Sequence, residues 1–468
     1  MTTAPSLQAL VLAAGLGTRM RSEKIKVLHE ILGVPLIGHV IAEALKSGAH
    51  RVIPILGHQR ERVEDYFRSQ PWAQNIDVAY QEEQLGTAHA VYSAQNFFDD
   101  SFEYTAILSG DVPNMDAPRL RAFFQATIDS GAAVGLVTAQ LDDPLTYGRI
   151  LRDGDQVRAI VEHADASKEE RAIQEINAGI YLVKTPFLRG ALEEIMTSNA
   201  ENAQKEYYLT DLIALAARGP GVFGWVIDEP QCIQGVNNRV QLSMATDFAR
   251  RRINEEWMLQ GVTLLQPDQV LIDANVIIEE DVTLYPGVHL AGQTVIRSGS
   301  IIEAGVQIRD SQIGPSAQIK AYSYLTDAMV GAESSIGPFA HLRPGSEIGP
   351  QCKIGNFVEV KKTRLHQGAK ASHLTYLGDA EVGPFANVGA GTITCNYDGH
   401  KKSTTTIGAH AFIGSNSALV APVRIGEGAY VGAGSVITED VPDKALGVAR
   451  GRQRNIAGWG DSQAKNEE

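Results

Sequence analysis

The hydrophobic residues of the first 240 positions form short apolar runs separated by longer amphipathic stretches. The runs predict strands at residues 9–12, 51–56, 105–108 and 133–139, and the stretches predict helices near 35–46 and 119–130. Strands that alternate with helices indicate a mostly parallel α/β sheet. Ligands bind beyond the carboxyl ends of such strands, so we expect the turns after residues 12 and 108 to lie together.

Residues 238–260 contain no Gly or Pro and are rich in charge. Val240, Met244 and Phe248 are four positions apart, the spacing of one helical face. This segment is therefore expected to be a helix that links two domains.

After Gly261 the hydrophobic period changes to six. Neither an α-helix, with period 3.6, nor a half-buried strand, with period 2, gives this spacing. A parallel β-helix of hexapeptide repeats does, with one inward aliphatic side chain for each short strand and a tight corner that tolerates glycine. The recurring residues are Val270, Val276, Val282 and Val288; Ile296, Ile302 and Ile308; Ile336, Leu342, Ile348, Ile354 and Val360; and Ile407, Ile413, Leu419, Ile425, Val431 and Ile437.

The repeat is interrupted at residues 395–406, "CNYDGHKKSTTT". Because these residues are polar and skip two hexapeptides, we expect a loop that leaves the coil. Loops of this kind commonly lie on the binding face of a solenoid.

Composition narrows the class of protein. The chain has 468 residues, enough for two or three domains, and a formal charge of -14 without a long basic stretch, which disfavours nucleic acid as a partner. Its three cysteines form no C-x-x-C pair, and no basic segment precedes the first apolar run. No apolar run approaches 18 residues, so no membrane span is expected. We therefore expect a cytoplasmic protein with reduced thiols.

The turn "LAAGLGTRM", residues 12–20, follows the first predicted strand. It lacks the third glycine of the dinucleotide motif G-x-G-x-x-G and the Gly-Lys-Ser/Thr of a P-loop. Exposed backbone N–H groups near a helix N-terminus, beside Arg19, would suit a polyphosphate.

Several longer motifs together resemble one family. They are "LAAGLGTRM", "QLGTAHA", "GDVP", "YGRI", "GVNNR", "LRPG", "GNFVEVKK", "HLTYLGDAEVG" and "GAGTITCNYDG". The chain is similar over most of its length to the bacterial bifunctional N-acetylglucosamine-1-phosphate uridylyltransferases/glucosamine-1-phosphate acetyltransferases. The resemblance implies a Rossmann-like uridylyltransferase domain at residues 1–239, a linker helix at 240–260, and a left-handed β-helix acetyltransferase domain at 261–468.

The resemblance implies a first site that uses UTP and Mg²⁺ to uridylylate N-acetylglucosamine 1-phosphate. Arg19 and Lys26 would lie against the triphosphate, and Asp111 with Asn237 would hold the metal. The other residues implied to bind nucleotide or sugar are Leu12, Ala13, Ala14, Gly15, Gln81, Gly86, Thr87, Ser109, Gly110, Gly148, Glu162 and Asn177.

The resemblance also implies a second site that transfers acetyl from acetyl-CoA to glucosamine 1-phosphate, in a homotrimer. His373 would be the base; histidine, with a pKa near 6.5, suits this task at neutral pH. The sugar phosphate would bind Arg343, Lys361, Tyr376 and Asn387, and acetyl-CoA would contact Ala390, Asn396, Tyr397, Ser415, Ala433 and Arg450. Lys361, Lys362, Arg364 and Lys370 are close in sequence and are expected to form a basic cluster for the phosphate.

Four positions depart from the family pattern: Leu16, Ile25, Ser109 and His341. Ile25 replaces a usual proline and could loosen the presentation of Lys26. Two alternatives stay open. The β-helix could serve only assembly and regulation of a sugar nucleotidyltransferase, or the chain could be a scaffold with a degenerate nucleotide site.

Overall fold

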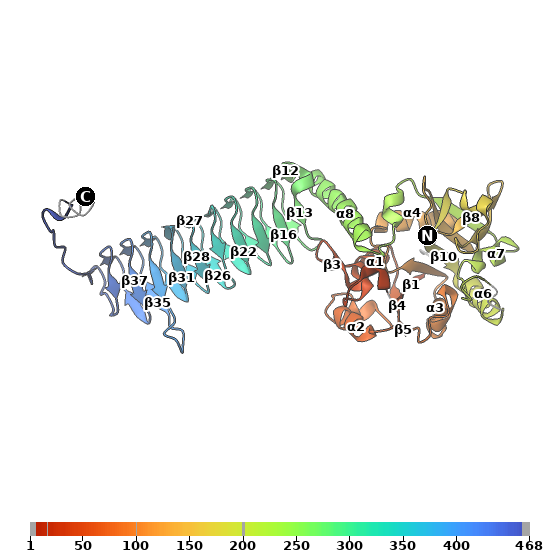
Figure 1. Ribbon diagram of the computed structural model, residues 1–468, viewed down its shortest axis with the longest axis horizontal. Coiled ribbons are helices and arrows are strands. Elements are labelled where there is room, and N and C mark those ends of the chain that lie inside the picture. Colours follow the sequence, from red (N-terminus) through yellow and green to blue (C-terminus); the bar gives the residue numbers. More distant parts are fainter. Residues whose placement is uncertain (1–5, 16, 100, 199–201, 461–468) are drawn as a thin grey trace, which may run out of the picture. The chain divides into compact units, whose positions relative to one another are not determined.

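A computed structural model describes residues 6–15, 17–99, 101–198 and 202–460 (Figure 1). Leu16 and the tail at 461–468 lie outside these ranges. The chain divides into two compact units, residues 1–250 and 251–468. Among the described residues, none of the helices combines the length and hydropathy that a membrane span needs.

The first unit is built on a nine-stranded mixed sheet with the main order β11-β7-β10-β6-β1-β4-β5. β1 is parallel to β4 and to β6, as expected, but β10 is antiparallel to β6 and β7. The sheet therefore departs from the predicted parallel arrangement at β10 and at the β8–β9 hairpin. Its strands are β1 (Leu7–Ala13), β4 (Arg51–Leu56), β5 (Ala79–Tyr80), β6 (Tyr104–Ser109), β7 (Val134–Gln140), β8 (Arg149–Asp153), β9 (Gln156–Val161), β10 (Glu175–Lys184) and β11 (Val222–Val226), with a separate hairpin of β2 (Glu30–Ile31) and β3 (Val34–Pro35).

Capping residues mark where helix α4 begins and ends. At the start of α4 the Asp116 carboxylate accepts a hydrogen bond from the Arg119 N–H at 3.0 Å, and Gly131, at φ 72°, ends the helix. The α-helices are α1 (Leu36–Lys46), α2 (Arg60–Arg68), α3 (Thr87–Ser93), α4 (Ala117–Ser130), α5 (Lys168–Arg171), α6 (Thr185–Thr197), α7 (Asp211–Ala217) and α8 (Arg239–Leu259). The 3₁₀ turns are η1 (Thr18–Met20), η2 (Lys26–Leu28), η3 (Ala73–Asn75), η4 (Gln95–Phe97), η5 (Pro230–Ile233) and η6 (Pro267–Gln269).

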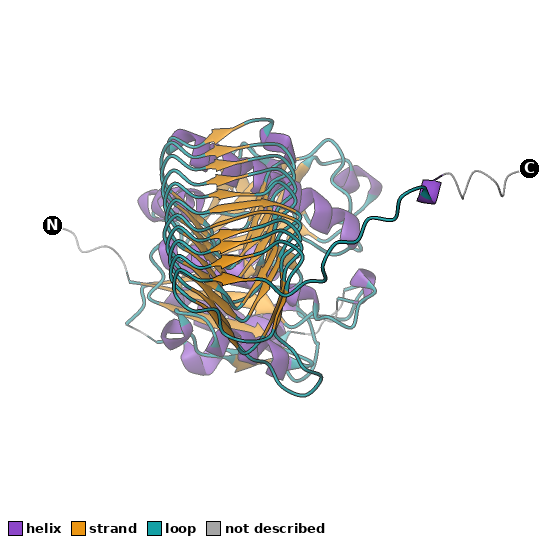
Figure 2. Ribbon diagram, turned by 90° about the vertical axis from the view of Figure 1, so that its left-hand side faces the viewer, coloured by secondary structure: helices purple, strands orange, loops and turns teal. Residues whose placement is uncertain are grey.

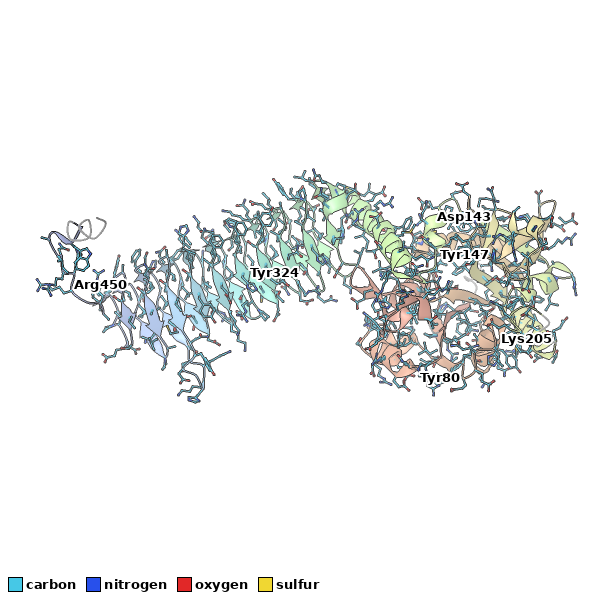
Figure 3. All side chains as sticks on the ribbon, viewed as in Figure 1. Tyr80, Asp143, Tyr147, Lys205, Tyr324 and Arg450 are labelled. Atoms are coloured by element: carbon cyan, nitrogen blue, oxygen red, sulfur yellow. The ribbon has the colours of Figure 1, made fainter. Side chains whose placement is uncertain are left out.

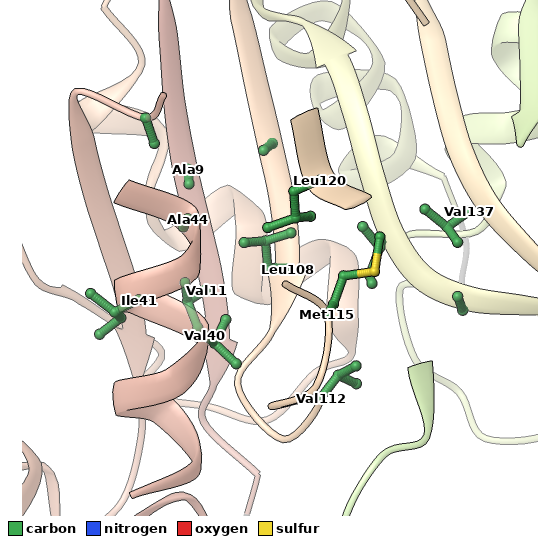
Figure 4. Packing of buried hydrophobic residues seen from close by; sticks show 14 of the residues in the cluster. Ala9, Val11, Val40, Ile41, Ala44, Leu108, Val112, Met115, Leu120 and Val137 are labelled. Carbon is green, nitrogen blue, oxygen red and sulfur yellow. The ribbon is translucent and has the colours of Figure 1, made fainter. Parts of the chain in front are cut away.

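Two hydrophobic clusters cover the two faces of the sheet. Adjacent residues of β1 point to opposite faces, so Val11 packs with α1 and α4 while Leu10 packs with α3 and α6. Figure 4 shows part of the first cluster, in which Leu120 lies next to Leu108 and Ile41 lies on helix α1. Burial on both faces explains the continuous apolar run of β1.

Helix α8 buries a different stripe from the predicted one. Val240 is 68% exposed and Met244 is 53% exposed, whereas Ala245 and Ala249 are buried and Phe248 packs against the core. The side-chain amide of Asn114 also donates to the Ala245 carbonyl at 3.1 Å. Small residues at 245 and 249 let the loop before α4 approach this stripe, a choice that hydrophobic spacing alone does not reveal.

The second unit is a left-handed parallel β-helix (Figure 2). Most residues pair with one 17 or 18 positions further on, as Thr283 with Ile301 and Ile301 with Gln318, and the spacing rises to 25 across the coil that carries the loop, as from Ala380 to Thr405. Face 1 holds β12 (Thr263–Leu264), β15 (Thr283–Leu284), β18 (Ile301–Ile302), β21 (Gln318–Ile319), β24 (Ser335–Ile336), β27 (Lys353–Asn356), β30 (Lys370–His373), β33 (Asn387–Val388), β36 (Phe412–Ile413), β39 (Tyr430–Val431) and β41 (Leu446–Gly447).

Two further faces complete each coil. Face 2 holds β13 (Leu271–Ile272), β16 (His289–Ala291), β19 (Gln307–Arg309), β22 (Tyr324–Thr326), β25 (His341–Leu342), β28 (Glu359–Lys361), β31 (Tyr376–Gly378), β34 (Ile393–Cys395), β37 (Ala418–Val420) and β40 (Val436–Ile437). Face 3 holds β14 (Ile277–Ile278), β17 (Val295–Ile296), β20 (Gln312–Ile313), β23 (Ala328–Val330), β26 (Ser346–Ile348), β29 (Arg364–Leu365), β32 (Ala380–Val382), β35 (Thr405–Ile407) and β38 (Val423–Ile425).

Every aliphatic residue of the predicted six-residue series is buried. Strands such as β13 and β14 each have one inward residue, as predicted, and many repeats bury a second residue at the corner. Val270 and Ile272 are both inside, as are Val276 and Ile278, the first of each pair at the corner and the second on the strand. The predicted loop is present between β34 and β35, and an isolated bridge joins Tyr397 to Lys402 within it.

Candidate active sites

The opening turn begins where β1 ends, between the carboxyl ends of its parallel neighbours β4 and β6. The side-chain amide of Gln84 donates to the Ala14 carbonyl at 2.7 Å and ties the turn to the loop after β5. Only the 3₁₀ turn η1 follows, so the expected helix N-terminus is absent from the described part of this turn. Gly17 adopts φ 62°, and a Cβ there would lie 2.5 Å from the Lys26 Cβ, so glycine is required for Lys26 to approach.

Four predicted residues converge beside this turn. The Lys26 Nζ lies 2.5 Å from Oδ2 of Asp111 and 2.9 Å from Oδ1 of Asn237, and the Arg19 guanidinium donates to the same Asn237 oxygen at 3.1 Å. The Val236 N–H donates to the Asp111 carbonyl and holds the two segments together. Two oxygen donors thus already surround one cation, which is the arrangement that Mg²⁺ needs from a protein that leaves several waters on the metal.

The neighbouring asparagine explains how Asn237 is free for this task. Asn238 begins α8, since its side-chain oxygen accepts from the Gln241 N–H at 2.9 Å. Asn237 instead donates its backbone N–H to Gln241 and keeps its side-chain oxygen for the two cations. Ile25 adopts φ -56°, the angle that proline would impose, so the replacement does not displace Lys26.

A cavity of about 310 Å³ opens at this edge of the sheet. Predicted residues in its lining are Leu12, Ala13, Ala14, Gly15, Lys26, Gln81, Gly86, Thr87, Ser109 and Asp111, and the sequence analysis missed Val27, Gln84, Ala90 and Glu206. Of these, Gln84 lies inside the quoted motif "QLGTAHA" that signalled the site, but its amide contact to Ala14 depends on the fold.

Two side-chain hydrogen bonds and a closely packed glycine hold the loop before α3 in place. Gln81 donates its side-chain amide to the Gly86 carbonyl at 3.0 Å, and Thr87 accepts from the Leu209 N–H at 3.0 Å. Gly86 has φ 114°, and a Cβ there would meet the Tyr207 carbonyl oxygen at 2.4 Å. Gly110 also lies close to β1: its N–H donates to the Leu12 carbonyl oxygen, with 2.9 Å between nitrogen and oxygen.

Gly148, Glu162 and Asn177 form a second group in the first unit. The Asn177 N–H donates to the Gly148 carbonyl at 3.0 Å, and a Cβ on Gly148 would lie 3.4 Å from the Glu162 carboxylate. Burial raises the pKa of Glu162, although the Thr210 hydroxyl donates to it. This group offers an acceptor carboxylate and an amide on one small surface, which suits sugar hydroxyls.

In the β-helix, His373 ends β30 on face 1, directly above Asn356 of β27 in the preceding coil. The His373 Nδ1 lies 2.7 Å from the Asn356 Oδ1. An amide oxygen only accepts, so Nδ1 carries a proton, and in the neutral ring the lone pair is on Nε2. Asn356 was missed by the sequence analysis, although it lies within the quoted motif "GNFVEVKK".

The predicted acetyl-CoA residues at corner 1/2, the corner between faces 1 and 2, form a column. The Gly391 N–H donates to the His373 carbonyl, and Ala390, one residue earlier, accepts from Asn416 at 2.7 Å. Ser415 accepts from Gly434 at 2.8 Å in the next coil, and the Arg450 guanidinium donates to the Ala433 carbonyl at 2.8 Å. Figure 3 labels Arg450 beyond the last coils of the β-helix and Tyr324 on β22.

Other predicted residues lie at corner 2/3, the corner between faces 2 and 3, which face 2 separates from corner 1/2. The Asp379 N–H donates to the Lys361 carbonyl, and the Asn396 amide reaches the Asp379 carboxylate at 2.5 Å. Lys402 of the loop, and then Arg343, lower the pKa of Lys361 by repulsion, while Arg343 itself pairs with Glu359 at 2.7 Å. Tyr376 of β31 lies between the two corners on face 2, Asn387 lies on face 1, and Tyr397 is in the loop and 60% exposed.

The expected basic cluster of Lys361, Lys362, Arg364 and Lys370 is not formed. Lys361 belongs to face 2, Arg364 to face 3, where it pairs with Glu347, and Lys370 to face 1. Neighbours in sequence turn to different faces because each hexapeptide makes one side of the triangular coil. The cations that do gather are Lys361, Arg343 and Lys402.

Two family models match the chain. Nucleotidyl transferase matches residues 8–218, and the bacterial transferase hexapeptide (six repeats) matches residues 327–362 and 404–439. The relatives are proteins named "Bifunctional protein GlmU". The relative from Trichlorobacter lovleyi is 48% identical over 96% of this chain and 97% of its own length. The relative from Carboxydothermus hydrogenoformans is 45% identical over 96% of this chain and 99% of its own length. That of Pelobacter propionicus is 45% identical over 97% of the chain and 98% of its own.

The chain belongs to the GlmU family. Near-complete coverage of both partners includes the nucleotidyltransferase unit and the hexapeptide unit, so the prediction of a bifunctional transferase is confirmed. The chain is an enzyme of UDP-N-acetylglucosamine biosynthesis with nucleotidyltransferase and acetyltransferase activities, and the predicted fold class is confirmed as well.

Proposed function

We propose that the two activities reside in separate units, at residues 1–239 and 261–468, joined by the helix at 240–260. The β-helix acetylates glucosamine 1-phosphate with acetyl-CoA, and the first unit then transfers uridylyl from UTP to N-acetylglucosamine 1-phosphate. The convergence of Arg19 and Lys26 with the Asp111 and Asn237 oxygens is the observation that supports this assignment most strongly. The cytoplasmic location stays a prediction.

In uridylyl transfer, an oxygen of the sugar phosphate attacks the α-phosphorus of UTP, and the bond to pyrophosphate breaks. The attacking oxygen is already an anion at pH 7, so the chain supplies positioning and charge rather than a base. Arg19 and Lys26 neutralise the triphosphate, and the N–H groups of residues 12–15 bind its oxygens. Asp111 and Asn237 would hold Mg²⁺, which would neutralise the charge that develops on the phosphates. Gln81, Gly86 and Thr87 contact the base, and Gly148, Glu162 and Asn177 contact the sugar.

In acetyl transfer, the free amine attacks the thioester carbonyl carbon, Nε2 of His373 takes a proton from the amine, and the C–S bond breaks to release CoA. Asn356 orients the ring through Nδ1. The corner 1/2 column of Ala390, Ser415, Ala433 and Arg450 binds acetyl-CoA, with Asn396 and Tyr397. Arg343, Lys361, Tyr376 and Asn387 bind the sugar phosphate.

We also propose a homotrimer with the acetyl-transfer site between subunits. The predicted site residues of one chain lie at two corners separated by face 2, so one chain alone does not gather them. Corner 1/2 carries an exposed ladder of Tyr322, Phe339 and Phe357, whose neighbouring ring centroids are 5.4 Å apart, and the exposed Leu374 follows in the next coil. Exposed apolar ridges of this kind mark protein contacts, and this one leads directly to His373.

The test follows free thiol and pyrophosphate separately in purified enzyme. His373→Ala is expected to abolish thiol release from acetyl-CoA with glucosamine 1-phosphate while leaving pyrophosphate release from N-acetylglucosamine 1-phosphate unchanged; Asp111→Asn is expected to do the reverse. Parallel loss of both signals in either variant that stays folded would contradict two separate sites. Pyrophosphate release without any thiol release by the wild type would mean that the β-helix serves assembly only.

A further inference from the structure

A second cavity of the first unit, of about 380 Å³, opens at the edge of the sheet where the parallel strands begin. We call it the amino-edge pocket. Leu7 starts β1 and pairs with Tyr104 at the start of β6, whereas the opening turn lies at the other end of the same strands. The lining residues are Leu7, Ser47, Gly48, His50, Tyr104, Arg121, Phe124, Gln125, Ile128 and Leu182. The cavity is large enough for a small organic ligand.

The walls of the amino-edge pocket are apolar. Leu7, Phe124 and Leu182 are each at most 8% exposed and belong to the hydrophobic cluster on the α1–α4 side of the sheet. Ile128 packs against this cluster from α4. A ligand inside would therefore need an apolar body to gain from burial.

The carbonyls at the end of α1, which borders the pocket, are already used. The Ser47 N–H donates to Glu43, the Ala49 N–H donates to Ala44, and the Gly48 N–H donates to Leu45, at 2.9 to 3.2 Å. The Arg121 Nη1 donates to the Lys46 carbonyl at 2.8 Å. The last four carbonyls of α1, at residues 43–46, are thus all engaged, and Arg121 keeps further N–H groups and its charge at the mouth.

Tyr104 is the buried polar group of the pocket. It is 4% exposed, and among the described residues no group hydrogen-bonds to its hydroxyl. Its pKa is raised by burial and by the neighbouring Glu103 charge, so the hydroxyl stays a donor at neutral pH. The nearby carboxylate of Asp129 already accepts from the Gln125 amide at 2.8 Å, and the His50 ring lies over Phe102 at 6.4 Å. The Tyr104 hydroxyl and the Arg121 guanidinium are thus two donors that the pocket can offer to a ligand.

We propose that the amino-edge pocket binds a small organic acid whose apolar body, an alkyl chain or a single ring, packs against Leu7, Phe124 and Leu182. Its carboxylate accepts from the Tyr104 hydroxyl and the Arg121 guanidinium. The site is separate from the cavity at the opening turn, since the two share no lining residue. The inference does not depend on the assignments of the two transferase sites.

The test measures binding of decanoate to the full chain by titration calorimetry, with decanol as the matched ligand that lacks the carboxylate. Decanoate is expected to bind at one site, and decanol about 10-fold more weakly because a charge-assisted hydrogen bond is lost. Arg121→Gln and Tyr104→Phe are each expected to weaken decanoate binding, by about 10-fold and about 3-fold. Arg218→Gln, at an exposed arginine distant in sequence, is the control and is expected to bind as the wild type does.

Ile128→Trp, which fills the cavity, is expected to abolish decanoate binding, and a thermal unfolding curve checks that each variant is folded. Equal binding of decanoate by wild type, Ile128→Trp and Arg121→Gln would overturn the proposal, as it would place the ligand elsewhere. Absence of decanoate and decanol binding by the wild type would overturn it too. Tighter binding of decanol than of decanoate would exclude an acid as the ligand class.

Discussion

The Lys26 ammonium lies 2.5 Å from the Asp111 carboxylate and 2.9 Å from the Asn237 amide oxygen, between the two groups proposed to hold Mg²⁺. Both side chains of the ion pair are largely buried, with 14% and 20% exposure. A lysine that contacts both oxygens stands in for the metal. It holds Asp111 and Asn237, which are 126 residues apart in the sequence, in one arrangement before substrate binds.

Because Lys26 must leave these oxygens when a divalent cation enters, Lys26→Met is expected to bind Mn²⁺ more tightly than the wild type does in the absence of UTP. A rise of about 10-fold corresponds to about 1.4 kcal/mol of relieved competition. Mn²⁺ binding is measured by electron paramagnetic resonance of the free ion. Lys24→Met, which removes an exposed pair with Glu30, is the control and is expected to leave the affinity unchanged. Weaker Mn²⁺ binding by Lys26→Met would show that the lysine supports the metal rather than competing with it.

Asn356→Ala is expected to lower acetyl transfer by about 10- to 100-fold, since outer partners of a functional histidine fix its tautomer. The pH profile of thiol release is expected to change as well, because both ring tautomers become available once the hydrogen bond to Nδ1 is lost. Uridylyl transfer is the internal control. An unchanged pH profile with lower activity would mean that Asn356 supports the coil and does not orient His373.

Glu162→Gln is expected to stabilise the protein at neutral pH while weakening sugar-phosphate binding. Burial raises the pKa of Glu162, so the folded protein keeps this proton to a higher pH than the unfolded chain does. Wild-type stability therefore falls as pH rises from the unfolded value near 4.3 through the folded one, and the variant lacks this loss. Chemical denaturation between pH 4 and pH 8 measures it.

Glu170→Gln is the control of opposite sign. Hydrogen bonds from Ser167 lower the Glu170 pKa, so this carboxylate adds stability above its unfolded pKa, and that stability is lost as pH falls through the folded value. Its removal is expected to lower stability at neutral pH. A lower neutral-pH stability for Glu162→Gln would contradict the assigned cost of burying that carboxyl.

Arg149→Met is expected to destabilise the first unit by about 1–3 kcal/mol, the cost of leaving buried acceptors unpaired. Arg149 is 2% exposed, and its guanidinium donates to the carbonyls of Leu145, Tyr147 and Arg171. Tyr147, labelled in Figure 3, precedes Gly148, so the KM for N-acetylglucosamine 1-phosphate should rise with the loss of stability.

Arg158→Met, on the adjacent strand β9, provides the comparison because that guanidinium is half exposed and pairs with Asp153. Its effect on the free energy of unfolding is expected to stay within about 0.5 kcal/mol. Equal effects of the two substitutions would show that the buried carbonyls near Arg149 are satisfied without it.

Much of the fold was predictable because it depends on local periodicity. The six-residue period located the β-helix, and the apolar runs located β1, β4, β6 and β7 to within one or two residues. The motifs predict residues for both sites, because each motif is a contiguous stretch with unusual residue types; these site assignments stay predictions. The antiparallel β10 was not predictable, since a buried strand has the same composition in either direction.

The sequence by itself determined which residues face the β-helix interior, where the repeat opens into a loop, and which family the chain belongs to, because these depend on spacing and residue type along the chain. Only the tertiary structure decided which side chains meet. It set Lys26 between Asp111 and Asn237, placed Asn356 under His373, and turned the neighbouring cations at 361, 364 and 370 to three different faces. The physical reason is that a coil of 17 or 18 residues and a crossover between strands bring distant positions together and send adjacent ones apart.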